Sequence, residues 1–370
     1  MDQYIITGNG EYSALDGLFE KLNIKTLFLV CGRSFDDLKI KKYFDTLTER
    51  LGIKVVRFSD FKPNPLYESV VEGVRIFNEN DCDAVFAVGG GSGMDVAKCV
   101  KMFAKMPTDK DYVLQTVEPN EIPLLAMPTT AGSGSEATKY AIIYYNGEKL
   151  TVTHESCIPS AVVMDSSVLE TLPLYQKKST MLDALCHAIE SYWSVKSTEE
   201  SREYAGKAIT EALKYKDAYL ANDPRGNEKM LWAAFIAGKA INITGTTAGH
   251  AMCYKLTGLY GLAHGHSAAL GVSKLWSYSI NNTNDCIDPR GEDYVCGMLN
   301  ELARLFGCEN AEQGAEKFQE LLDSLELPKP SAGEKDLEIL TKSVDPAKLN
   351  SNPVALNQHI IRDLYKLIIS

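Results

Sequence analysis

The first half of the chain alternates short apolar runs with segments of helical periodicity, and this alternation strongly constrains the fold. The expected strands lie at 27–31, 54–58, 84–88 and 124–127, and all of them except 54–58 (KVVRF) are apolar throughout. Helix-period stretches at 65–78 and 93–104 lie between them. Parallel strands joined by crossover helices produce this pattern. We therefore expect an α/β domain with a doubly wound, mostly parallel, Rossmann-like sheet, whose ligands bind beyond the carboxyl ends of the strands.

The second half has a different character. From Leu174 onward strand signals vanish, and the helix-period segments are 179–195, 199–220, 228–243, 247–259, 267–279 and 357–368. The turn-rich stretch 281–293 is typical of a surface loop. We expect two domains, an α/β domain at 1–173 and an all-helical domain at 174–370.

Composition limits the class of protein. The nine cysteines are scattered and form no CxxC pair, which favours reduced intracellular thiols over a disulfide framework. No apolar run approaches the roughly 18–20 residues of a membrane span, and Met1-Asp2-Gln3-Tyr4 shows no secretory signal. The net charge of −11 and the lack of a basic run disfavour nucleic-acid binding. We expect a cytoplasmic protein that binds neither nucleic acid nor membrane.

A glycine-rich run follows the third apolar segment. Residues 89–98 read GGGSGMDVAK, at the end of a predicted strand and the start of a predicted helix. Glycines there allow a pyrophosphate close to the backbone, where the first N–H groups of the helix point at the anion and Ser92 adds a hydroxyl. The run matches neither GxGxxG nor a P-loop. A tight strand–helix turn without a ligand is the alternative.

A second polar loop follows the fourth apolar segment. Residues 128–136 read PTTAGSGSE, and the hydroxyls of Thr129, Thr130 and Ser133 suit a phosphate, a ribose or a carboxamide. The alternative is a capping segment that starts the next element at Ser133 or Ser135. Two such loops after two strands of one sheet favour nucleotide binding.

Scarce histidines suggest a metal site. Asp183 and His187 lie four residues apart in a helical stretch, so both face one side, about 6 Å apart along the axis. With His250 and His264 they offer one carboxylate and three imidazoles, which suit Fe(II), Zn(II) or Co(II). The alternatives are a solvated helix face and His266 in place of His264.

Two other histidines and a nearby glutamate have weaker signals. His154 and His359 have no partners in sequence and are expected to be structural or on the surface. Glu190, one turn past His187, is expected either to support a metal ligand or to be an ordinary helix charge.

Together these segments resemble the iron-containing (group III) alcohol dehydrogenase family. The matching motifs are Pro63-Asn64-Pro65, 89–98 (family GGGSxxDxAK), 128–136 (family PTTAGTGSE), 183–190 (family DALxHAIE) and His264-Gly265. The resemblance implies a dehydroquinate synthase-like architecture, in which a nucleotide-binding α/β domain precedes an all-helical metal-binding domain. It also implies a homodimer.

Carried over by position, the resemblance assigns the metal ligands and the cofactor contacts. The metal ligands fall on Asp183, His187, His250 and His264. The dinucleotide contacts fall on Asn64, Gly90, Gly91, Ser92, Asp95, Thr129, Thr130, Ser133 and Lys149. The family's chemistry implies Fe(II) or Zn(II) and a hydride passed between NADPH or NADH and a carbonyl carbon.

Two departures from the family pattern concern the cofactor and the proton. Many members carry an Asp after the first strand, where it repels a 2′-phosphate. Here Gly32 and Arg33 stand there, which should admit NADPH and let it be used at least as well as NADH, unless Arg33 only faces solvent. Many members also carry a histidine four residues after the third metal ligand, where this chain has Tyr254. Tyr254, Cys253, a water or the nicotinamide ribose would then relay a proton.

A third departure concerns the substrate. The stretches 240–255 and 259–266 resemble the phosphonoacetaldehyde reductase (2-hydroxyethylphosphonate dehydrogenase) branch of the family. For a dianionic substrate, Thr246, Thr247 and Lys255 would supply donors and a positive charge near the metal, with Lys255 counted among the catalytic residues. The alternative is a solvated Lys255 and threonines that cap the helix of His250.

Three other functions remain open. The chain could be a dehydrogenase of short alcohols, polyols or 4-hydroxy acids with the same fold. It could be a lyase-type relative such as dehydroquinate synthase, although Asp183 and the histidines fit the dehydrogenases better. It could also be a non-catalytic nucleotide-binding protein, which would make the four metal-ligand positions accidental.

Overall fold

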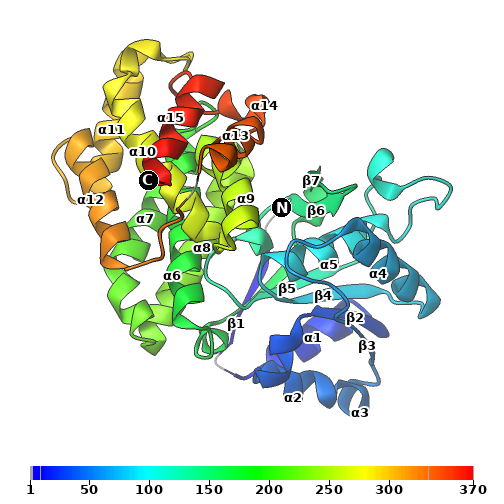
Figure 1. Ribbon diagram of the computed structural model, residues 1–370. Coiled ribbons are helices and arrows are strands. Elements are labelled where there is room, and N and C mark those ends of the chain that lie inside the picture. Colours follow the sequence, from blue (N-terminus) through cyan, green and yellow to red (C-terminus); the bar gives the residue numbers. More distant parts are fainter. Residues whose placement is uncertain (1–2, 9, 332, 370) are drawn as a thin grey trace. The chain divides into compact units, whose positions relative to one another are not determined.

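The computed structural model describes residues 3–8, 10–331 and 333–369 (Figure 1). The chain divides into two compact units, Met1–Thr171 and Leu172–Ser370. Each unit has its own core, and each is considered separately.

Among the described residues, unit 1 is built on a six-stranded sheet in the order β1-β8-β5-β4-β2-β3. The strands are β1 (Tyr4–Gly8), β2 (Thr26–Cys31), β3 (Lys54–Phe58), β4 (Ala84–Gly89), β5 (Leu124–Pro128) and β8 (Ala161–Asp165). All of their pairings are parallel. The expected parallel, doubly wound sheet is therefore confirmed.

Helices cover both faces of this sheet, which explains why its central strands are continuously apolar. Phe86 of β4 packs against Phe19 and Phe44, so one face is covered by α1 and α2. Phe28 of β2 belongs to the core cluster on the other face, under α4 and α5. The helices of the unit are α1 (Ser13–Lys21), α2 (Ile40–Asp45), α3 (Leu47–Leu51), α4 (Tyr67–Glu79) and α5 (Gly91–Phe103).

The strand order reverses direction between β2 and β4. The chain leaves β2 toward β3 on one side of the sheet and leaves β4 toward β5 on the other. Ligands of open α/β sheets bind at such a point, beyond the carboxyl ends of the strands. The loop at Gly32 and the loop at Gly90 flank it, so the topology places two predicted cofactor loops at the position where a nucleotide site is expected.

A two-stranded antiparallel hairpin also belongs to unit 1. It consists of β6 (Tyr140–Tyr145) and β7 (Glu148–Thr153). Its turn residues Asn146 and Gly147 have φ angles of +52° and +78°. An Asn-Gly pair readily adopts positive φ at both positions, which is what a tight two-residue hairpin requires.

Unit 2 is helical throughout its described residues apart from short turns and one isolated bridge, which confirms the expected all-helical character. Its helices are α6 (Leu174–Trp193), α7 (Glu199–Leu220), α8 (Pro224–Thr244), α9 (Ala248–Tyr260), α10 (His264–Asn281), α11 (Glu292–Leu305), α12 (Ala311–Ser324), α13 (Glu334–Lys342), α14 (Pro346–Leu349) and α15 (Gln358–Ile368). α6 packs against α7, α8 and α10. Its second half is therefore buried on all sides, including its polar residues.

Short 3-10 helices occur in both units. They are η1 (Arg33–Asp37), η2 (Tyr112–Leu114), η3 (Ser135–Ala137), η4 (Glu155–Cys157), η5 (Ser166–Leu169) and η6 (Thr283–Asp285). No helix in the described ranges has the length and apolar character needed to cross a membrane.

Candidate metal and cofactor sites

The four predicted metal ligands converge on one oxygen atom. Asp183 and His187 lie one turn apart on α6, His250 lies in the first turn of α9, and His264 begins α10. The Nε2 atoms of His250, His187 and His264 lie 3.3, 3.9 and 3.9 Å from Oδ1 of Asp183. The structure thus brings together residues that are up to 81 positions apart.

The geometry fits a single metal ion. The donor atoms of Asp183, His187 and His250 lie within 4.8 Å of one another, and all three residues are buried. Tetrahedral ligands about 2.1 Å from a metal lie roughly 3.4 Å apart, close to the separations seen here. The side chain of His264 is 43% exposed, so it forms the open side of the cluster. One carboxylate and three imidazoles suit a first-row divalent ion.

Two glycines make this convergence possible. A Cβ on Gly265 would lie 2.0 Å from the Ser179 carbonyl oxygen and 2.6 Å from Cβ of Asp183. A Cβ on Gly249 would lie 2.5 Å from Cγ2 of Val272. Each glycine directly adjoins a histidine of the cluster, so the missing side chains allow α10 to approach α6 and α9 to approach α10.

Glu190 holds His250 from the side opposite the cluster. Its Oε2 contacts Nδ1 of His250, and its Oε1 accepts from the backbone N–H of His250 at 3.2 Å. Oε1 also accepts from the N–H and the hydroxyl of Thr247, at 3.0 and 2.7 Å. A carboxylate on Nδ1 fixes the proton there and turns Nε2 toward the metal position. Of the two interpretations of Glu190, the structure favours support of a ligand.

The charges of the cluster depend on one another. Burial alone would raise the pKa of Asp183, but His187, His264 and His250 outweigh it and hold that pKa below its usual value. The pKa of Glu190 is likewise lowered, because His250 outweighs its burial. Burial opposes the charged form of His250, but Glu190 and Asp183 raise its pKa to about 9. The site therefore concentrates negative charge that a cation can neutralise.

The other predicted histidines lie elsewhere. His266 is buried, and its Nδ1 lies 3.2 Å from the Tyr175 hydroxyl. His154 caps η4, where Nδ1 accepts from the Ser156 N–H at 3.1 Å. His359 is exposed beside Asp363. The first of these was the alternative to His264, and its ring is directed at Tyr175 on α6.

The three predicted substrate residues differ in position. Thr246 is half-buried and Thr247 is fully buried, with its hydroxyl between Glu190 and the Trp193 indole N–H, which donates to it at 3.0 Å. Lys255 has an exposed side chain on α9. Five residues of helix place it about 140° around the axis from His250. The structure thus places Lys255 on a different side of α9 from the metal cluster.

Three residues gather at His264: Tyr254 and Cys253, which the sequence suggested as proton relays, and Lys348, which it did not indicate. The ring of Tyr254 stacks on His264, with centroids 5.9 Å apart and planes 12° apart. Nζ of Lys348, on α14, donates to the Tyr254 hydroxyl at 3.3 Å. Cys253 contacts the edge of the His264 ring, with 3.5 Å between Sγ and Nδ1. Lys348 lies 94 positions from Tyr254, and the sequence carries no signal that pairs them.

In unit 1, the predicted cofactor residues gather at the carboxyl ends of β4 and β5. A Cβ on Gly90 would lie 3.1 Å from Cγ2 of Thr130, and one on Gly91 would lie 3.4 Å from Cβ of Ser133. The backbone N–H of Asn64 donates to the Ser92 hydroxyl at 3.3 Å. Thr129 joins the loops through its N–H, which donates to the Gly89 carbonyl at 3.0 Å. The N-terminus of α5 therefore opens into a loop cluster rich in hydroxyls, which suits a pyrophosphate.

Two charged residues of the 89–98 motif, Asp95 and Lys98, lie beneath the loops of the predicted cofactor site. The buried Lys98 donates to the carbonyl oxygens of Ser135, Thr138 and Tyr140 at 2.6, 2.7 and 2.8 Å. Burial raises the pKa of Asp95 to about 7, against the opposing charges of Lys98 and Lys149. Lys98, which sequence reasoning did not assign, thus fixes the loop that follows β5.

The loop after β2 carries the predicted cofactor-selecting pair. Gly32 is extended, and a Cβ there would meet no atom within 4 Å. Arg33 is exposed. Arg57, at the end of β3, binds the Asp36 carboxylate through two hydrogen bonds of 2.7 and 3.0 Å. Asp36 of this loop is therefore already paired with an arginine that the sequence analysis did not assign.

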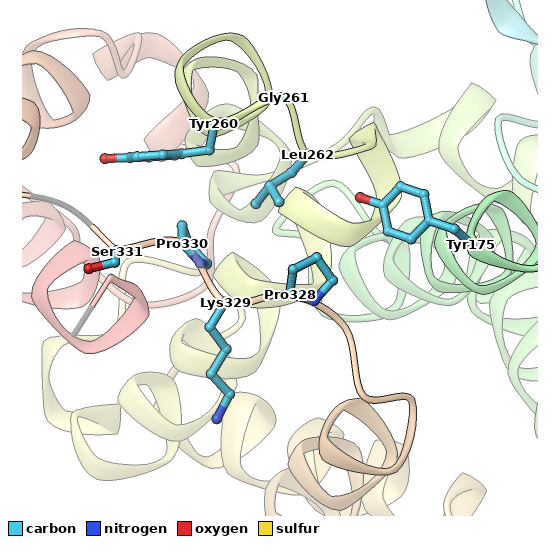
Figure 2. Close-up of a pocket in the computed structure, with 8 residues that line it drawn as sticks. All are labelled: Tyr175, Tyr260, Gly261, Leu262, Pro328, Lys329, Pro330 and Ser331. Atoms are coloured by element: carbon cyan, nitrogen blue, oxygen red, sulfur yellow. The ribbon is translucent and has the colours of Figure 1, made fainter.

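Unit 2 contains a cavity of about 490 Å³ that none of the predicted site residues lines. Figure 2 shows its lining residues. Tyr175 and Tyr260 line it together with Leu262 and a proline-flanked segment around Lys329. The side chain of Lys329 points away from the two tyrosines. The metal cluster, rather than this cavity, carries the chemistry considered below.

Comparisons with known protein families agree across both units. Residues 3–166 match the family model of the iron-containing alcohol dehydrogenases. Residues 177–369 match the model of the C-terminal part of the Fe-containing alcohol dehydrogenase family. These two matches cover the sheet and the metal cluster respectively.

Individual relatives agree with the family matches. A phosphonoacetaldehyde reductase from Streptomyces viridochromogenes is 34% identical over 254 residues, a match that covers 65% of this chain and 64% of the relative. Alcohol dehydrogenase 4 from Schizosaccharomyces pombe is 28% identical over 86% of this chain and 76% of its own length. A solved sulfoacetaldehyde reductase from Bifidobacterium kashiwanohense, in complex with NAD⁺, superimposes with a TM-score of 0.87 at 25% identity, over 100% of this chain and 97% of its own.

Proposed function

The chain belongs to the iron-containing alcohol dehydrogenase family, and from that premise we propose that it is a metal-dependent, NAD(P)H-linked reductase of a small aldehyde. The leading substrate is phosphonoacetaldehyde, reduced to 2-hydroxyethylphosphonate. A cytoplasmic location and a homodimeric assembly complete the proposal.

The observation that carries this proposal is the convergence of three imidazole Nε2 atoms on Oδ1 of Asp183. When bound, a divalent iron ion supplies Lewis-acid polarisation of a carbonyl oxygen, and a reduced nicotinamide supplies the hydride. Asp183, His187 and His250 would hold the ion from the buried side. His264 would hold it from the exposed side, where a small substrate has access.

The remaining residues have positioning roles in this proposal. Glu190 keeps the Nδ1 proton on His250, so that Nε2 offers its lone pair to the ion. The loops at Gly90, Ser92, Thr130 and Ser133 would bind the cofactor pyrophosphate through N–H and hydroxyl groups. Asn64, Asp95, Thr129 and Lys149 would complete the cofactor site.

Two relatives support an anionic aldehyde as substrate. The phosphonoacetaldehyde reductase and the sulfoacetaldehyde reductase are both named for short aldehydes with an acidic group. Thr246 and Lys255 stay predicted substrate residues, although the side chain of Lys255 is exposed. Thr247 would act indirectly, by holding Glu190 in place, because its hydroxyl connects Trp193 with Glu190.

The loop after β2 supports NADPH as the preferred cofactor. Gly32 places no carboxylate beside the expected 2′-phosphate, and Arg33 offers an exposed guanidinium group directly after β2. Arg57, at the end of the adjacent strand β3, pairs with Asp36 and so neutralises that carboxylate. Guanidinium groups bind phosphate through paired hydrogen bonds.

The test is reduction of four aldehydes by Fe(II)-loaded protein with NADPH and NADH. Phosphonoacetaldehyde should exceed propanal, sulfoacetaldehyde and succinic semialdehyde in kcat/KM. An excess of about 100-fold over propanal corresponds to roughly 2.7 kcal/mol of discrimination. Equal rates with propanal would leave only a general short-chain alcohol dehydrogenase. Absence of turnover together with absence of metal binding would favour a non-catalytic nucleotide-binding protein.

A further inference from the structure

A lysine and a tyrosine extend the metal cluster on the side of its most exposed ligand. Tyr254 stacks in parallel on His264, and Lys348 approaches the same tyrosine from α14. Nζ of Lys348 lies 3.3 Å from the phenol oxygen and 4.9 Å from the centroid of the ring. One aromatic ring therefore links an ammonium group to a metal ligand.

The environment of Lys348 is suited to an anion. Burial is the main influence on its pKa and lowers it, while Asp345, Cys253 and Glu190 act in the opposite direction. The hydrogen-bond partner of Nζ is a neutral phenol, which compensates the lost hydration of an ammonium less than a carboxylate does. An anionic ligand that reached Nζ would recover this lost stabilisation.

We propose that Lys348, together with the Tyr254 hydroxyl, binds the anionic head group of the aldehyde substrate and so determines specificity for charged over neutral short aldehydes. This inference rests on the proposed function, because it assigns a charge-recognising element to the same metal site. The ammonium supplies the positive charge and the phenol supplies a hydroxyl donor. A phosphonate and a sulfonate share the chemistry that this pair would recognise.

The position of Lys348 distinguishes it from the lysine that the sequence suggested. Lys255 directly follows Tyr254, but its side chain is exposed on another side of α9. An exposed ammonium is fully hydrated and gains little by binding a single anion. Lys348 is half-buried and contacts the ring that stacks on His264. We therefore place the positive charge for the head group on Lys348, and Lys255 is the competing candidate in the experiment below.

The experiment compares Lys348→Met, Lys348→Arg, Tyr254→Phe and Lys255→Met in the full-length, Fe(II)-loaded protein. The quantity measured is the ratio of kcat/KM for phosphonoacetaldehyde to kcat/KM for propanal. Lys348→Met should lower this ratio by about 30-fold or more, mainly through KM, because the charged head group loses its counter-charge. Lys348→Arg, which keeps the positive charge, should retain most of the wild-type ratio. Tyr254→Phe keeps the ring and should give a smaller loss.

A binding measurement separates recognition from turnover. 2-Hydroxyethylphosphonate should inhibit propanal reduction in the wild-type protein, and its inhibition constant should rise at least tenfold in Lys348→Met. Lys342→Met, which removes an exposed lysine of α13 paired with Glu338, is the matched control and should change neither the ratio nor the inhibition constant. Iron content and circular dichroism of each variant establish that the site is intact.

The outcomes separate this inference from the proposed function. An unchanged ratio in Lys348→Met, or a loss shown by Lys255→Met instead, would overturn the inference while phosphonoacetaldehyde remained the substrate. If sulfoacetaldehyde is the preferred wild-type substrate and Lys348→Met abolishes that preference, the inference stands and the phosphonate assignment fails. If no anionic aldehyde exceeds propanal in the wild-type protein, both fail. An equal loss for charged and neutral aldehydes would make Lys348 merely structural and would also overturn the inference.

Discussion

The carboxylate of Glu190 lies against Nδ1 of His250 on one side and caps the first backbone N–H groups of α9 on the other. A negative charge at a helix N-terminus is stabilised by the partial positive charge of the free N–H groups. Thr247 and Trp193 continue the network, which leaves the carboxylate fully buried and fixed in orientation. The orientation of His250 toward Asp183 thus follows from a helix cap as much as from the metal position.

We expect Glu190→Gln to weaken metal binding by about 10–100-fold, because the amide removes the charge that keeps the proton on Nδ1 of His250. Equilibrium dialysis with Fe(II) or Co(II) measures this loss without any dependence on turnover. Glu199→Gln changes an exposed acid at the start of α7 and should leave the affinity unchanged. An unaltered affinity in Glu190→Gln would remove Glu190 from the support of the site.

His264→Ala should abolish metal-dependent turnover, because the cluster loses the ligand on its exposed side. Binding of NADPH, followed by its fluorescence, should stay close to that of the wild-type protein, since the predicted cofactor residues belong to unit 1. His359→Ala removes an exposed histidine and serves as the control. Full turnover in His264→Ala would show that His264 is not a ligand.

Gly32→Asp should reduce the use of NADPH far more than that of NADH, because the new carboxylate would lie where a 2′-phosphate is expected. Substitution is sterically possible, since a Cβ at Gly32 meets no atom within 4 Å. The ratio of kcat/KM for the two cofactors should shift toward NADH by at least tenfold, or about 1.4 kcal/mol. Gly17→Asp adds the same charge at an equally open position of α1. Equal effects on both cofactors would contradict the role of Gly32 and Arg33.

His266 should make unit 2 sensitive to acid. Burial lowers its pKa to about 4, whereas an exposed histidine in the unfolded chain titrates near 6.5. The unfolded state therefore binds the proton first, and folding stability falls as the pH drops from about 6.5 toward 4. The loss amounts to at most about 3 kcal/mol.

The test for His266 uses the three tryptophans Trp193, Trp232 and Trp276, which all belong to unit 2. Urea unfolding followed by their fluorescence should show a smaller decrease in stability between pH 6.5 and 4.5 in His266→Gln than in the wild-type protein. His359→Gln should retain the wild-type pH dependence. Parallel pH profiles for His266→Gln and the wild-type protein would show that His266 is not the sensitive group.

The buried centre of unit 1 was predictable because its strands are continuously apolar. β2, β3, β4 and β5 lie within two residues of the predicted runs. The sheet edge strand β1 and the inner strand β8 were not predicted, nor was the β6–β7 hairpin. β1 has only five residues, of which Ile6 and Gly8 are buried, and so short a strand shows no distinct period in the sequence. Asn146-Gly147 is nonetheless a typical signal of such a hairpin.

Prediction of the candidate site from the sequence had similar limits. Motif spacing together with the family resemblance indicated Asp183, His187, His250 and His264, and the structure gathers these four. It did not indicate Lys348, because a contact between α9 and α14 depends on packing rather than on local periodicity. The resemblance of residues 240–255 to the phosphonoacetaldehyde reductase branch gave Lys255 a role near the metal, although its side chain is exposed and lies about 140° around the helix axis from His250.

The close approach at Gly265 has a consequence for how the protein responds to metal supply. Because this contact fixes α10 on α6, the four ligands join segments that are distant in the chain, and an ion bound by all of them links those segments as a crosslink would. A ligand that binds only the folded state stabilises it in proportion to the logarithm of its free concentration. The melting temperature of the helical unit would then depend on the metal concentration in the cell. Protein synthesised under iron starvation would be degraded faster than protein synthesised with ample iron.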